Sequence, residues 1–131
     1  MDAVQEAKAL VAEHEALVRA ADLDGIVANV AEDAVLLAPD TPLVEGKAAF
    51  REFYAGLLGM GASDFGHDYH GAEVVADTVV LYGVARGTLT PPEGDPESFA
   101  NNFLLMVKKQ ADGKYRFWRG GFAASGEIET E

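Results

Sequence analysis

One histidine stands among apolar residues at a spacing that predicts a buried side chain, and a buried imidazole is a candidate for chemistry. Leu10 and Val11 precede His14 by four and three positions. Leu17 and Val18 follow it by three and four, so all five share one face of a helix. An imidazole there can donate a hydrogen bond, or act as an acid or base near neutral pH. The alternative is a core histidine satisfied by one structural hydrogen bond.

An amide interrupts an apolar strand face in the second half of the chain. Phe99, Phe103 and Leu105 alternate with their neighbours and place Asn101 on their own face, while Asn102 points the other way. A buried amide needs hydrogen-bond partners. Asn101 therefore either pairs with backbone or orients a bound ligand.

One carboxylate, Asp40, is a candidate general base. It lies two residues beyond Ala38, and on a regular strand it would share that residue's face. Pro39 and Pro42 flank it, and Asp is common in such turns. Asp40 is thus either a displaced base or an ordinary turn residue.

No pattern in the chain predicts a metal or a cofactor. His67 and His70 are three apart, so on a regular strand they face opposite sides and cannot share one ion. The nucleophile elbow G-x-S-x-G, the phosphate loop G-x-x-x-x-G-K-[ST] and the dinucleotide fingerprint G-x-G-x-x-G are all absent. We therefore expect chemistry, if any, to come from side chains alone.

Composition limits the class of protein. The chain has 131 residues, no cysteine and a net charge of −12 from 10 basic and 22 acidic residues. Such a surface repels phosphate backbones and anionic membranes, so we expect neither nucleic acid nor membrane as a partner. No apolar run approaches the roughly 20 residues of a membrane span, and no signal peptide is visible. The absence of cysteine favours a cytoplasmic location. The length predicts a single domain, residues 1–131.

The apolar spacing predicts helices first and strands afterwards. One helix covers residues 4–21, a second begins at Asp22 and buries residues up to Val30, and a third begins at Gly46. Strands are expected at residues 34–38, 43–44, 66–76, 78–90, 98–110 and 114–124, the last two joined at Asp112-Gly113. This order predicts an α+β fold with helices on one face of a mostly antiparallel sheet.

Several blocks resemble one known superfamily. DLDGIV at 22–27 with AEDA at 31–34, EGKAAFREFY at 45–54, and NFLLMVKKQ at 102–110 with DGKYR at 112–116 resemble the ketosteroid isomerase branch of the NTF2-like (SnoaL-like) superfamily. The resemblance covers nearly the whole chain. It implies a cone: three N-terminal helices packed on a curved sheet around a deep apolar pocket.

The same resemblance assigns roles to individual residues. The family's carboxylate base corresponds to Ala38, whose methyl group accepts no proton, so steroid isomerisation by the family mechanism is expected to be weak or absent. The family's two oxygen-binding donors correspond to His14 and Asn101, and its supporting aromatic to Tyr54. Trp118 falls on a strand that faces the pocket, with Phe122 on the same face.

Two hypotheses follow. In the first, the protein binds a small apolar, oxygenated molecule, as an isomerase, dehydratase or cyclase without metal or nucleotide cofactor. His14 and Asp40 are then the catalytic candidates, and the ligand-binding candidates are His14, Tyr54, Asn101, Trp118 and Phe122. In the second, it is a non-catalytic dimeric ligand-binding or protein-interaction module. Apolar residues on both faces of the strand at 98–110 predict a homodimer in either case.

Overall fold

A computed structural model describes residues 2–125, with the backbone alone at residues 63 and 64. In chain order the elements are α1 (Ala3–Arg19), α2 (Leu23–Ala28), β1 (Val30–Leu37), β2 (Val44–Glu45), α3 (Gly46–Gly59), β3 (Ala62–Val75), β4 (Thr78–Leu89), β5 (Glu97–Lys109) and β6 (Tyr115–Ala124).

Short polar residues begin the first two helices. Asp2 accepts a hydrogen bond from the Gln5 amide at 2.8 Å, and the Gln5 side chain accepts one from the Asp2 amide, which forms a capping box. The predicted cap Asp22 accepts from the Gly25 amide at 3.0 Å and begins α2. Most of the predicted apolar stripe of α1 is buried, including Leu10, Val11, His14 and Val18, whereas Leu17 is half-buried.

The first long strand starts earlier than the sequence predicted. Helical spacing placed Val30 on the second helix, but α2 ends at Ala28 and Val30 begins β1. Val30 lies opposite Phe117 in a parallel pairing of β1 with β6. A β-branched residue paired across a sheet is stabilised by contacts that local helical spacing does not reveal.

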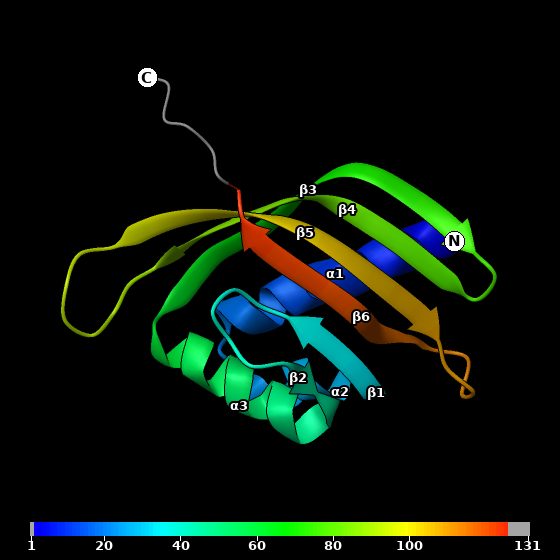
Figure 1. The fold of residues 1–131 in the computed structure, drawn as a ribbon, viewed down its shortest axis with the longest axis horizontal. Helices are drawn as coiled ribbons and strands as arrows, with labels where there is room; N and C mark the ends of the chain where they lie inside the picture. The colour runs from blue at the N-terminus through cyan, green and yellow to red at the C-terminus, as the bar shows by residue number, and fades with distance from the viewer. Residues whose placement is uncertain (1, 126–131) are drawn as a thin grey trace.

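The strands form one curved sheet in the order β2-β1-β6-β5-β4-β3. The pairing of β1 with β6 is parallel, and the other neighbours pair antiparallel. Figure 1 shows α1 lying across the long strands and α3 lying beside β1 and β2. The α+β fold with three helices packed against a mostly antiparallel sheet is therefore confirmed.

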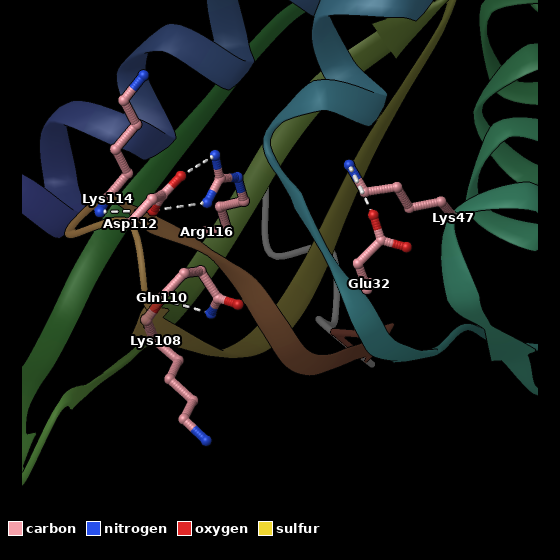
Figure 2. Close-up of polar contacts among 7 residues, drawn as sticks. All are labelled: Glu32, Lys47, Lys108, Gln110, Asp112, Lys114 and Arg116. Atoms are coloured by element: carbon pink, nitrogen blue, oxygen red, sulfur yellow. Dashed lines mark hydrogen bonds and ion pairs between the residues drawn. The ribbon is translucent and has the colours of Figure 1, made fainter.

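Figure 2 shows polar contacts at two places in the fold, the turn between β5 and β6 and the contact between β1 and α3. In the predicted turn between β5 and β6, the Asp112 carboxylate accepts from the Lys114 amide at 3.0 Å and pairs with the Arg116 guanidinium at 2.9 Å. Gly113 has a φ of 86°, a conformation that suits glycine. Across the molecule, Lys47 at the start of α3 lies 4.0 Å from Glu32 of β1.

The buried residues form two clusters rather than one. The first joins α1 to β4 and β5 and includes Leu10, Val11 and Leu81; the second joins β1, β2 and α3 and includes Leu36 and Phe50. Phe122 of β6 packs against both clusters. No helix within residues 2–125 is long and apolar enough to cross a membrane.

Candidate functional site

A cavity of about 120 Å³ lies where the two core clusters meet. All seven phenylalanines of the chain line it. Other walls come from β1, from α3 and from Ala85 of β4. An engineered apolar cavity of about 150 Å³ holds one benzene molecule, so this cavity has the size of roughly one small ring.

Two of the sequence candidates meet at the wall of this cavity. His14 of α1 and Tyr54 of α3 both line it, and His14 Nε2 lies 3.3 Å from Tyr54 Oη. Burial, with a smaller contribution from the nearby His67, lowers the pKa of His14 to about 3. Burial also raises the pKa of Tyr54 above its usual range. Both groups are therefore neutral near pH 7.

The hydrogen bond between them leaves one polar hydrogen unused. If Tyr54 donates to Nε2, the imidazole carries its proton on Nδ1; if Nε2 donates, the phenol hydrogen is free. His14 Nδ1 is buried and has no hydrogen-bond partner within residues 2–125. The rings of Tyr54, Phe65 and Phe117 surround the imidazole edge to face. The pair therefore has hydrogen-bonding capacity that the described residues do not use.

The structure brings Asn101 to the same cavity. It lies on β5 opposite Ala85 of β4 and is half-buried. Its side chain makes no hydrogen bond among the described residues. Its neighbour Asn102 is exposed and lines a shallow depression on the other face of the sheet. The alternation predicted from the sequence therefore places one amide at the cavity and one outside it.

Trp118 and Phe122 of β6 also line the cavity, but the two neighbours of Trp118 differ from expectation. Regular alternation predicts Phe117 and Arg119 on the face opposite Trp118, whereas all three residues line the cavity. The cause is a shift of register: Met106 lies opposite Arg119, and Val107 lies opposite Phe117. Trp118 therefore has no paired residue on β5, as in a β-bulge, and the alternation of side chains fails there.

Arg119 is held firmly at this bulge. Its guanidinium carbon lies 4.2 Å from the centre of the Trp118 ring, and its Nη1 donates to the carbonyls of Asp33 and Trp118. The Trp118 indole N–H donates to the Asp33 carboxylate at 3.3 Å. The charge of Arg119 is thus occupied by backbone oxygens and an aromatic face.

Asp40 lies away from the cavity. It is exposed, has a φ of 53° and belongs to the turn that follows β1. Neither Asp40 nor Ala38 is among the described residues that line the cavity. The extrapolation from Ala38 to Asp40 assumed a continuing strand, but β1 ends at Leu37. The position of Asp40 therefore does not support a catalytic role for it.

Sequence reasoning missed one polar pair at the cavity. His67 of β3 lines it, and its Nδ1 lies 2.8 Å from Glu15 Oε2 of α1. The His67 side chain is 5% exposed and the Glu15 side chain 19%. Burial lowers the pKa of His67, while the hydrogen bond and charge of Glu15 act in the opposite direction.

A signal for this pair was present in the sequence. Phe65, His67 and Tyr69 alternate along β3, a period that puts three rings on one face. His70 is exposed, and the register of β3 against β4 shifts between Tyr69 and Gly71. In the part of the chain that the structure describes, no cluster of side chains suits a metal ion.

Comparison with known families places the chain. The SnoaL-like domain family matches residues 11–129, and the protein belongs to that family. This membership agrees with the NTF2-like, ketosteroid isomerase-related resemblance of the sequence blocks.

Solved structures share the fold at low identity. A ketosteroid isomerase-like protein from Erwinia carotovora atroseptica is 20% identical with a TM-score of 0.82, covering 95% of this chain and 97% of the other. An NTF2-like protein with a cystatin-like fold from Novosphingobium aromaticivorans is 17% identical with a TM-score of 0.74, covering 95% and 82%. An NTF2-like superfamily protein from Salmonella enterica is 13% identical with a TM-score of 0.79, covering 95% and 92%. No curated protein sequence matches the chain.

Proposed function

We propose that this protein binds a small, uncharged, mostly apolar organic molecule that carries a carbonyl or hydroxyl oxygen. The observation that supports it best is the pair of His14 and Tyr54, 3.3 Å apart at the wall of a cavity lined by seven phenylalanines. Ligand sites of this kind combine apolar walls with a few oriented polar groups.

The polar groups define what the ligand must offer. His14 and Tyr54 are neutral near pH 7, so they favour a neutral hydrogen-bonding oxygen over an ion. Asn101, from β5, adds an amide that donates and accepts. A molecule with one oxygen on a small ring provides an apolar body for the phenylalanines and a partner for these side chains.

The cavity volume bounds the ligand. At about 120 Å³ it is smaller than the roughly 300–1,000 Å³ of pockets for drug-sized molecules. A single six-membered ring with one or two substituents fits that volume, and a four-ring steroid does not. This limit supports the expectation, drawn from Ala38, that ketosteroids are not the substrate.

The single tryptophan supplies the experiment, because Trp118 lines the cavity. Its fluorescence is titrated with cyclohexanone and with toluene, which has a similar size but no oxygen. N-acetyltryptophanamide corrects for quenching in free solution. The proposal predicts a saturable change with both molecules and tighter binding of cyclohexanone. Linear, unsaturated quenching by both would contradict it.

The face of the sheet away from the helices supports the proposed homodimer. Tyr82, Leu104, Gly121 and Leu37 lie opposite one another in register and form a row across β4, β5, β6 and β1. Tyr82 is 50% exposed, Leu104 44% and Leu37 58%. An apolar row of this length is typical of an interface, and a second copy with the same row is the occupant that we propose.

A further inference from the structure

We propose that His67 is a general base in this cavity and that Glu15 is the residue that positions it, so that the protein transfers a proton to and from its bound ligand. This inference rests on the proposed function and adds a reaction to it. It assigns the role to a pair that the sequence candidates did not include.

The hydrogen bond between the two residues fixes the chemical form of the imidazole. Glu15 Oε2 lies 2.8 Å from His67 Nδ1, so the carboxylate accepts the Nδ1 proton. The neutral ring then carries its lone pair on Nε2, which makes no hydrogen bond within residues 2–125. A base needs such a free lone pair within reach of the ligand, and His67 lines the cavity.

The neighbouring groups keep the ring neutral before the reaction and stabilise it afterwards. Burial lowers the pKa of His67, whereas Glu15 and Asp68 raise it. Asp68 is itself paired with Arg86 of β4 at 3.3 Å. His14 of α1 is neutral near pH 7. Tyr69, which lies on β3 with His67, has a pKa raised to about 12. Glu15 is thus the carboxylate in direct contact with a developing imidazolium.

The reaction is a proton transfer next to a carbonyl group. His67 Nε2 takes a proton from the carbon beside the carbonyl, and the electron pair of that C–H bond forms a C=C bond. The carbonyl π pair moves to the oxygen, where the free hydrogen of the His14–Tyr54 pair donates a hydrogen bond. His67 then returns a proton to carbon, so atoms and charge balance and no co-reactant is needed.

Deuterium exchange of cyclohexanone measures this step directly. The full chain is incubated in D₂O with cyclohexanone, and loss of the α-hydrogens is followed by NMR while binding is measured separately by Trp118 fluorescence. His67→Gln should bind cyclohexanone as the wild type does and lose about 100-fold or more of the protein-catalysed exchange rate. His70→Gln, the exposed histidine of the same strand, should keep both.

The outcomes separate the two claims. Binding without exchange in the wild type, or an unchanged exchange rate in His67→Gln, overturns the role of His67 and leaves the proposed function standing. Absence of binding overturns the proposed function, and the inference falls with it.

The pH profile provides the second test and does not require that His67→Gln fold. Exchange by the wild type should fall as the pH drops through the lowered pKa of His67, because only the neutral ring is a base. In Glu15→Gln that pKa is lower still, so the fall should move to lower pH and the plateau rate should decrease. The proposal is contradicted if the wild-type exchange rate does not change between pH 7 and pH 4. It is also contradicted if Glu15→Gln has the same pH profile as the wild type.

Discussion

Tyr54 Oη lies 3.3 Å from His14 Nε2, so a phenol from α3 and an imidazole from α1 share one hydrogen bond beside a cavity of about 120 Å³. Neither group is charged near pH 7, because burial lowers the pKa of His14 to about 3 and raises that of Tyr54. His14 therefore suits hydrogen bonding better than acid–base work. Burying these two polar groups costs free energy because one polar hydrogen has no partner among the described residues, and this cost is the main reason to expect a ligand.

The double variant His14→Leu/Tyr54→Phe distinguishes a binding role from a structural one. A buried polar group without a partner costs about 1–3 kcal/mol, whereas replacing both partners by apolar groups is nearly neutral. We expect the double variant to unfold in urea at or above the wild-type midpoint and to lose the preference for cyclohexanone over toluene. A midpoint well below that of Tyr54→Phe alone would show that the pair holds the fold together.

Asn101→Leu should weaken cyclohexanone binding without destabilising the fold. The amide makes no hydrogen bond among the described residues, so its removal leaves no partner unsatisfied. Loss of one ligand hydrogen bond corresponds to about 0.5–1.5 kcal/mol, or roughly 2- to 10-fold in Kd. Asn102→Leu, on the opposite face, is the matched control and should bind normally. Equal binding by the two variants would remove Asn101 from the site.

Stability should fall as the solution is acidified through the usual pKa of histidine. Burial lowers the pKa of His14 from 6.5 to about 3. Between these values the unfolded chain binds a proton that the folded chain does not, so stability decreases with falling pH by roughly 1 kcal/mol per pH unit. His67 adds to the loss in the same direction.

Urea unfolding of the wild type and of His14→Leu between pH 7 and pH 5 measures this contribution. The variant should have the smaller slope of unfolding free energy against pH, because one buried titrating group is gone. Parallel slopes for the two proteins would mean that folding does not lower the pKa of His14.

Leu104→Glu should separate the proposed dimer into monomers. Leu104 is 44% exposed and lies in the middle of the apolar row between Tyr82 and Gly121. A carboxylate there would be buried without a partner at the interface. Sedimentation should give a species near the 13.9 kDa of one chain. Leu43→Glu, which replaces a leucine that is 55% exposed and lies outside the row, should stay dimeric. A monomeric wild type would contradict the proposal.

The fold was largely predictable because local patterns agree with tertiary packing. The stripe around His14 and the turn at Asp112-Gly113 each encode an element within a few residues. The start of β1 at Val30 depends on pairing with Phe117, 87 positions later, which no local pattern contains. The register shift at Trp118 likewise depends on β5 and brought Arg119 to the cavity.

The site was predictable only in part, for a related reason. His14, Tyr54 and Asn101 interrupt apolar faces, and that interruption is visible in the sequence. The pairing of His67 with Glu15 joins a strand to a helix. The alternation of Phe65, His67 and Tyr69 marks the face of His67, but no local pattern places Glu15 beside it. A base at Asp40 requires a strand that continues past Leu37, but β1 ends there, and the end of a strand is a boundary that local sequence predicts poorly.

Histidine ring ¹⁵N NMR with and without cyclohexanone tests the central claim most directly. The protein has three histidines, and His14→Leu assigns one set of signals. We predict that saturating cyclohexanone shifts the His14 nitrogens while the ring stays neutral from pH 8 to pH 5, and that exposed His70 does not respond. Binding of cyclohexanone with the His14 signals unchanged, or no binding at all, would contradict a ligand site at the His14–Tyr54 pair.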